Sequence, residues 1–146
     1  MVRFRKLTED DIKQVANLEQ ENFKDAWSIS SIRETFLQAQ ALIAVAEVES
    51  KIVGYCILYH VLDEGEIARI AVSNGFRRKG IGRGILDFVS QYCVEEQVRR
   101  LLLDVREGNR TARKFYEQYG FTEDGIRKAF YDNPKEDAVL MSMTIA

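Results

Sequence analysis

The sequence has 146 residues, of which 46% are hydrophobic and 30% charged, and its formal net charge is −2 at pH 7. This length fits one domain, residues 1–146, that buries roughly two-thirds of the surface of its unfolded chain. The slightly negative charge argues against broad nucleic-acid binding, which normally shows as a strongly basic domain. No apolar run approaches the ~20 residues of a membrane helix, and the first residues lack the apolar core of a signal peptide. We therefore expect a cytoplasmic protein with neither membrane nor nucleic-acid partners.

The histidine and cysteine content narrows the possible chemistry. His60 is the single histidine, so neither a Ser-His-Asp triad nor a metal site with several histidines is expected. Cys56 and Cys93 lie on apolar faces of a strand-like and a helix-like segment. We interpret both as buried free thiols, and we expect no metal.

The first half of the chain combines short extended runs with two amphipathic helices. Thr8 begins a capping-box-like sequence before a helix that we expect to run to about Phe23. Ser28 can cap a second helix, with Ile32 on its apolar face. Alternating or β-rich residues predict four strands, at about 2–6, 41–48, 52–61 and 66–73.

The second half reads as alternating helices and strands. Apolar residues recur at helical spacing from Ile81 to Cys93, and Asn109 can cap a further helix that Gly120 ends. Strands are predicted at about 100–105, from Phe121 onward, and at about 138–145. The stretch 127–137 is predicted to be irregular and to form a substrate loop. This order predicts an α/β fold with a mixed sheet.

The basic, glycine-rich stretch from Arg77 to Gly84 lies between a predicted strand and a predicted helix. Glycines let the backbone approach a ligand, and the first N–H groups of a helix suit a phosphate. A P-loop is excluded because the required spacing and the hydroxyl that follows its lysine are absent. A dinucleotide fold is disfavoured because the stretch follows the fourth strand rather than the first. A basic helix start with glycines needed only for packing remains the alternative.

The pattern Arg77-x-x-Gly80-x-Gly82 resembles the acetyl-CoA pyrophosphate loop of the GNAT superfamily of N-acetyltransferases. Residues 103–109 and 112–121 are similar to a later motif of that family, in which an Asn and a Tyr flank the cofactor thiol. The resemblance covers nearly the whole chain. It implies an α/β (α+β) fold with a mixed, mostly antiparallel sheet of six to seven strands, flanked by about four helices.

Features near the two ends narrow the resemblance. Trp27-Ser28, Arg127, Tyr131 and residues 136–141 are similar to the RimI-like branch, whose members acetylate the N-terminal alanine of a small-subunit ribosomal protein. The resemblance implies acetyl-CoA as co-substrate and a protein N-terminus, that of a ribosomal protein, as acceptor. It leaves the oligomeric state open.

The resemblance also implies roles for individual residues. Asp104 stands where RimI-like enzymes carry a Glu general base, and Tyr116 would stand near the sulfur. The positions implied to bind acetyl-CoA are Ile70, Ala71, Val72, Arg77, Arg78, Lys79, Gly80, Ile81, Gly82, Arg83 and Asn109. The positions expected to contact the acceptor are Trp27, Glu64, Glu66 and Tyr131.

The chemistry of amide formation agrees with these roles. An amine attacks a thioester only when neutral, and an α-amino group has a pKa of about 8, against roughly 10.4 for lysine. A carboxylate such as Asp104 can accept the proton; because Asp is shorter than Glu, we expect a route through water. The departing thiolate can take a proton from the phenol of Tyr116.

Each assignment has an alternative. Asp104 could be a solvated strand end or an ion-pair partner of Arg106, and Tyr116 could be a core residue. The Asp at the base position, Ala26 before Trp27, and Glu66 depart from the RimI-like pattern. A transferase acting on a small-molecule amine or a lysine is therefore the first alternative, and a non-catalytic acyl-CoA-binding module is the second.

Overall fold

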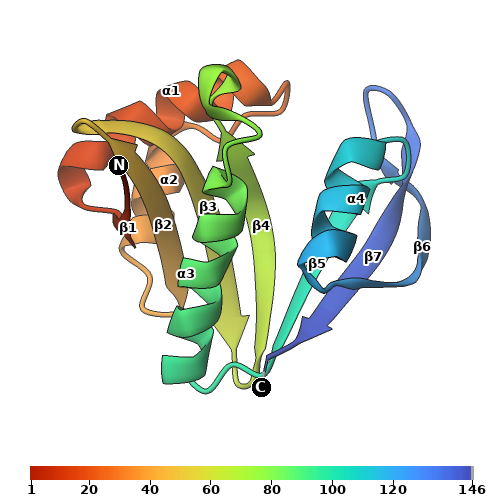
Figure 1. Ribbon diagram of the computed structural model, residues 1–146. Coiled ribbons are helices and arrows are strands. Elements are labelled where there is room, and N and C mark those ends of the chain that lie inside the picture. The colour runs from red at the N-terminus through yellow and green to blue at the C-terminus, as the bar shows by residue number, and fades with distance from the viewer. Residues whose placement is uncertain (146) are drawn as a thin grey trace.

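The computed structural model describes residues 1–145 and has one seven-stranded sheet with four α-helices (Figure 1). The strand order is β1-β2-β3-β4-β5-β7-β6, and β4–β5 is the parallel pair in an otherwise antiparallel sheet. The expected mixed, mostly antiparallel sheet is thus confirmed. The strands are β1 (Val2–Lys6), β2 (Ala41–Val48), β3 (Lys51–Val61), β4 (Glu64–Val72), β5 (Arg100–Arg106), β6 (Thr122–Tyr131) and β7 (Glu136–Thr144). The helices are α1 (Ile12–Asn22), α2 (Ile29–Phe36), α3 (Ile81–Glu95) and α4 (Arg110–Tyr119), with short 3-10 turns at Glu9–Asp11 and Asn74–Phe76.

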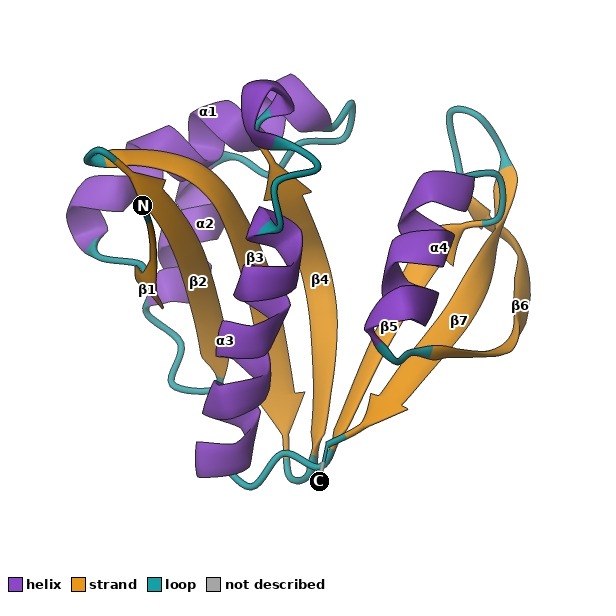
Figure 2. Ribbon diagram, viewed as in Figure 1, coloured by secondary structure: helices purple, strands orange, loops and turns teal. Residues whose placement is uncertain are grey.

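Helices cover both faces of the sheet. Figure 2 shows α3 and α4 on the near face, α3 over the first four strands and α4 over the last three, while α1 and α2 lie behind. Alternate residues of each strand point to opposite faces, so the chain builds two cores. The core beneath α3 and α4 includes Ile85, Leu103 and Tyr116, and the core beneath α1 and α2 includes Ile32 and Tyr55.

The parallel pair β4–β5 is short. The two strands pair at Glu64–Arg100, Gly65–Leu101 and Glu66–Leu102, and beyond these positions they diverge like the arms of a V (Figure 1). In addition, β4 bulges at Ala68, which the ladder between β3 and β4 skips. The edge of β4 after Glu66 that faces β5 therefore has no strand partner within residues 1–145.

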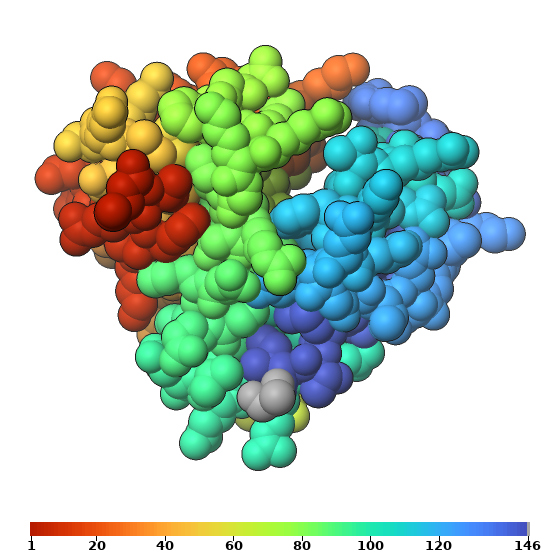
Figure 3. Space-filling model, in the orientation of Figure 1, coloured from red at the N-terminus to blue at the C-terminus, as the bar shows by residue number. Residues whose placement is uncertain are grey.

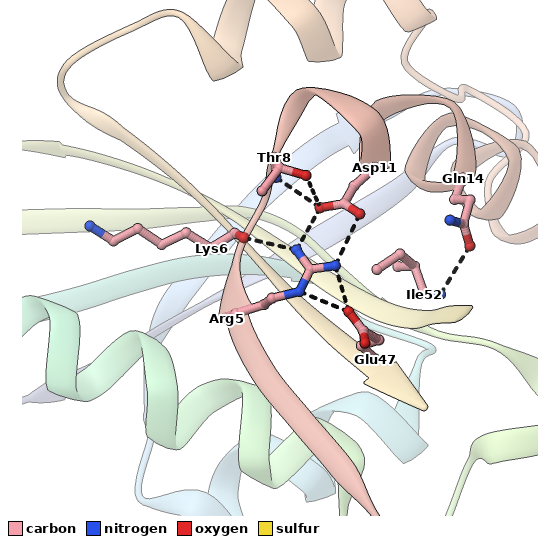
Figure 4. Close-up of polar contacts among 7 residues, drawn as sticks. All are labelled: Arg5, Lys6, Thr8, Asp11, Gln14, Glu47 and Ile52. Atoms are coloured by element: carbon pink, nitrogen blue, oxygen red, sulfur yellow. Dashed lines mark hydrogen bonds and ion pairs between the residues drawn. The ribbon is translucent and has the colours of Figure 1, made fainter. Parts of the chain in front are cut away.

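A charged cluster fastens the first strand to its surroundings. Arg5 on β1 pairs with Asp11, at 2.6 Å, and with Glu47 on β2, also at 2.6 Å (Figure 4). Asp11 in turn accepts a hydrogen bond from the backbone N–H of Thr8 at 2.8 Å, as the capping-box pattern predicts. The pKa of the Asp11 carboxyl is lowered, and the hydrogen bonds from the Arg5 guanidinium are the largest cause.

Most predicted elements are confirmed, with boundaries shifted by one or two residues. The prediction of a long irregular segment at 127–137 is wrong. β6 continues to Tyr131 and β7 starts at Glu136, so the connection is only residues 132–135. The error arose because Asn133-Pro134 marks a turn, and the sequence does not show how far the flanking strands extend into it. Cys56 and Cys93 are free and buried, as expected. No helix within residues 1–145 is long and apolar enough to cross a membrane.

Candidate active site

The turn after β4 presents unpaired N–H groups. Arg78 and Gly80 have positive φ angles, 61° and 80°, and Gly80 precedes the first residue of α3. The helical ladder begins where Gly84 N–H donates to the Gly80 oxygen at 3.0 Å. The N–H groups of residues 81–83 therefore have no partner inside the helix, and they lie at its positive end. This arrangement can bind a phosphate group.

The glycines of this stretch serve different purposes. A Cβ on Gly82 would lie 3.1 Å from the ring of Phe115 on α4, so Gly82 keeps the helix start close to α4. A Cβ on Gly84 would clash with the ring of Phe4 on β1. Gly84 is therefore needed for packing, while Gly80 is needed for its left-handed backbone. Packing thus explains two of these glycines and backbone conformation the third, and phosphate binding stays a prediction.

The basic side chains of the turn contact different parts of the protein. Arg77 is directed back into the protein, where its Nε donates to the Val72 oxygen at 3.0 Å and its Nη2 to Asn22 Oδ1 at 2.5 Å. Lys79 Nζ lies 5.7 Å from the centroid of the Phe76 ring. Arg83 lies 5.5 Å from the centroid of Tyr119 on α4. Figure 3 shows a furrow between the green surface that contains this turn and the cyan surface of α4. The exposed Arg77 side chain is thus already hydrogen-bonded to Val72 and Asn22.

Asp104 and Tyr116 approach the opening between β4 and β5 from opposite faces of the sheet. Leu103 and Val105, the neighbours of Asp104 on β5, are buried in the core beneath α3 and α4, so Asp104 points to the other face. Tyr116, on α4, belongs to that same core and is 7% exposed. Asp104 forms no ion pair with Arg106, which pairs with Glu136 instead. The alternative of an Asp104–Arg106 ion pair is thus not observed.

The phenol of Tyr116 stays protonated over a wide pH range. Burial is the largest cause that raises the pKa of Tyr116 well above its ordinary value of 10.0, and the neighbouring Cys56 thiol is the second. Its ring packs edge-on against Phe121, with ring centroids 5.6 Å apart. The phenol is therefore protonated when a leaving group forms, while its raised pKa makes it a weaker acid than an ordinary tyrosine.

Asn109 caps α4. Its Oδ1 accepts a hydrogen bond from the backbone N–H of Ala112 at 3.1 Å. The cap leaves the amide nitrogen of Asn109 as a donor at the start of α4.

Arg106 holds the connection between β6 and β7. Its guanidinium donates to the backbone oxygens of Asp132, at 3.1 Å, and Pro134, at 2.9 Å. It also pairs with Glu136 at 3.2 Å, and Glu136 accepts a hydrogen bond from the Gly108 N–H at 2.7 Å. This hairpin end is therefore joined to the start of α4.

Arg106 also orients Tyr131. The guanidinium lies 4.4 Å from the centroid of the Tyr131 ring. Burial, followed by the negative charge of Asp104, raises the pKa of Tyr131 to about 12. The structure thus brings Tyr131 and Asp104, both predicted from the sequence, into one neighbourhood.

The segment at Trp27 is anchored by Glu19, a residue that the sequence analysis did not identify. Glu19 on α1 is fully buried, and its Oε2 accepts from the Trp27 N–H and from Arg69 Nε, both at 2.9 Å. Its Oε1 accepts from the hydroxyl of Tyr55. Arg69 on β4 also reaches Asp25 at 3.1 Å. The sequence does carry a signal for this role. Glu19 follows Val15 by four residues, so a carboxylate lies on the apolar face of the helix.

Glu64 and Glu66, which are expected to contact the acceptor, lie at different distances from Asp104. Glu66 is level with Leu102 in the β4–β5 register, two residues before Asp104. Glu64 is level with Arg100, four residues before Asp104 and roughly 13 Å away along the strand. Glu64 also lies 3.6 Å from the Arg100 guanidinium. The structure therefore brings Glu66, but not Glu64, near the opening.

Comparisons with known proteins identify the family to which this chain is similar. The model of the acetyltransferase (GNAT) family matches residues 12–121. A Bacillus subtilis (strain 168) protein, provisionally named [ribosomal protein bS18]-alanine N-acetyltransferase, is 32% identical over 142 residues, 97% of this chain and 94% of that relative. A [ribosomal protein bS18]-alanine N-acetyltransferase of Haemophilus influenzae is 32% identical over 136 residues, 90% of this chain and 91% of that relative. The crystal structure of the ribosomal-protein-S18-alanine N-acetyltransferase from Escherichia coli superposes with a TM-score of 0.91 at 28% identity, covering 100% of this chain and 95% of that one.

Proposed function

Since the chain belongs to the acetyltransferase (GNAT) family, we propose that it transfers the acetyl group of acetyl-CoA to the N-terminal α-amino group of a ribosomal protein, with bS18 as acceptor. Membership of the family makes it an N-acetyltransferase with acetyl-CoA as the donor substrate. The names of the relatives at 32% identity support the choice of acceptor.

One observation carries the proposal. Asp104 and Tyr116 lie on opposite faces of the sheet, beside the place where β4 and β5 diverge. A donor that lies between the two strands would thus meet a carboxylate on one side and a phenol on the other. These two groups can assist amide formation from a thioester as general base and general acid.

Donor binding would use backbone groups more than side chains. The pantetheine arm would pair with the open edge of β4 at residues 70–72, as an added strand pairs with a sheet edge. The pyrophosphate would meet the N–H groups of the turn after β4, with Arg78, Lys79 and Arg83 supplying positive charge. The free amide nitrogen of Asn109 would donate to the arm.

The reaction would proceed by direct attack. The neutral amine forms a bond to the thioester carbonyl carbon while Asp104 receives the amine proton, directly or through a water molecule. The carbon–sulfur bond then breaks, and Tyr116 gives its proton to the departing thiolate. Solvent restores both groups. General-base assistance of this kind is typically worth ~10²- to 10⁴-fold in rate.

The test is an acetylation assay with a panel of acceptors, read by thiol release and by the mass of the product. The panel contains a peptide with the N-terminal sequence of bS18, the same peptide with a blocked N-terminus and an internal lysine, and a free polyamine. We expect thiol release with the first peptide alone. Release only with lysine or polyamine would contradict the proposed acceptor, and release with none would favour a non-catalytic acyl-CoA-binding module.

A further inference from the structure

A hollow of about 370 Å³ lies between α2 and β3, on the face of the sheet to which Asp104 points. Trp27 and Tyr59 form its aromatic walls, with ring centroids 6.4 Å apart and planes inclined by 37°. The Tyr59 hydroxyl is held at 2.6 Å from Thr35 Oγ1, and Thr35 is buried. The ring of Tyr59 is therefore fixed before any ligand arrives.

Two carboxylates, those of Glu34 and Glu66, lie on the same face of the sheet as the two rings. Glu34 on α2 lines the hollow and is exposed, and no lysine or arginine lines it. Glu66 lies directly opposite Tyr59 in the ladder between β3 and β4, so both residues are on the same face. Within residues 1–145, neither Glu34 nor Glu66 takes part in an ion pair. Two aromatic walls and the unpaired carboxylate of Glu34 form a site that suits a cation, with Glu66 on the same face of the sheet.

The strand register gives the distance from this hollow to the acceptor amine. Tyr59 is level with Glu66, and Glu66 is level with Leu102, two residues before Asp104. In a regular ladder, two strand spacings and two residues along β5 amount to about 12 Å between the Cα atoms of Tyr59 and Asp104, and the divergence of β4 from β5 beyond Leu102 makes this a minimum. An extended peptide advances roughly 3.3–3.6 Å per residue. A peptide whose amine meets Asp104 therefore brings the side chain of its second or third residue to the hollow.

We propose that this hollow is a second acceptor subsite, which takes the arginine or lysine side chain at the second or third position of the acceptor peptide. The proposal rests on the proposed function, because it needs a peptide whose N-terminus lies at Asp104. The side chain lies in the hollow against the rings of Trp27 and Tyr59, and Glu34 accepts its N–H donors. Arginine is favoured over lysine because a planar guanidinium both stacks on rings and donates two parallel hydrogen bonds to a carboxylate.

The test compares peptides that begin with the same alanine and carry Arg, Lys, Gln or Glu at the second position, with a second series varied at the third. We expect kcat/KM at low ionic strength to be about tenfold higher for Arg than for Gln in one of the two series, mainly through KM. Glu should be the poorest residue. Equal kcat/KM for Arg, Gln and Glu in both series would overturn the subsite while leaving N-terminal acetylation intact; acetylation of no peptide would overturn both.

Variants separate the subsite from general surface charge. Glu34→Gln should lower the Arg-to-Gln ratio about three- to tenfold. Glu117→Gln removes the same charge from an exposed position of α4, which packs on the opposite face of the sheet, and should leave the ratio unchanged. Tyr59→Phe keeps the ring and should preserve the ratio, whereas Tyr59→Leu removes the aromatic wall and should lower it. The subsite is refuted if Glu34→Gln and Glu117→Gln give the same ratio.

Discussion

The buried carboxylate of Glu19 can be tested by comparing Glu19→Gln with Glu19→Ala. A glutamine can place its Oε1 where Glu19 Oε2 stands, accepting from the Trp27 N–H and Arg69 Nε, now both at 2.9 Å. Its Nε2 then faces the hydroxyl of Tyr55, which can accept as well as donate. Glutamine therefore preserves the connections between α1, β3, β4 and the segment at Trp27, and it loses only the negative charge.

Alanine preserves none of these contacts. It leaves the Trp27 N–H and the Tyr55 hydroxyl without an acceptor, and it breaks a buried ion pair, a change that typically costs about 3–5 kcal/mol. We expect the lower end of that range, because Arg69 is 14% exposed and keeps Asp25 as a second partner. The Gln variant should cost about 1 kcal/mol, the difference between charged and neutral hydrogen bonds.

The measurement is the free energy of unfolding in urea, with Glu21→Gln as the matched control at an exposed position of the same helix. The control should remain within about 0.5 kcal/mol of the original protein. In acetylation assays, Glu19→Ala should raise KM for the acceptor peptide because the segment at Trp27 loses its anchor. A Gln variant as unstable as the Ala variant would refute the argument that hydrogen-bond geometry, rather than charge, is what Glu19 supplies.

Four further predictions concern the reaction and the packing. Asp104→Asn should lower turnover by ~10²-fold or more, with the residual rate rising as the α-amine loses its proton near pH 8; an unchanged profile would remove Asp104 from the mechanism. Tyr116→Phe should slow turnover while leaving the Kd for CoA, measured by calorimetry, within about twofold; equal turnover in the two proteins would reject its role as the acid. Gly84→Ala should destabilise the protein by roughly 1 kcal/mol, because the clash with Phe4 outweighs the gain in helix propensity, and Phe4→Leu should relieve that cost in urea unfolding. Burial raises the pKa of Cys93 to about 11, so iodoacetamide at pH 8 should label this thiol only after unfolding; rapid labelling of the folded protein would contradict its burial.

Much of the fold could be predicted from the sequence because its signals are local. The cap at Ser28, the cap at Asn109 and the glycine that ends α4 act on backbone groups within a few residues of themselves. The period of apolar residues from Ile81 to Cys93 likewise depends only on helix geometry. The extent of β6 was mispredicted because a strand is stabilised by a partner strand, and its neighbour β7 comes later in the chain.

The sequence alone therefore determined the order of the elements, the two buried thiols and the turn whose N–H groups suit a phosphate. Tertiary structure decided which residues meet. It placed Asp104 and Tyr116 on opposite faces beside the divergence of β4 and β5, paired Glu19 with a residue 50 positions later, and separated Glu64 from the opening that Glu66 approaches. These relations follow from strand register and from the burial of two cores, which depend on the whole chain.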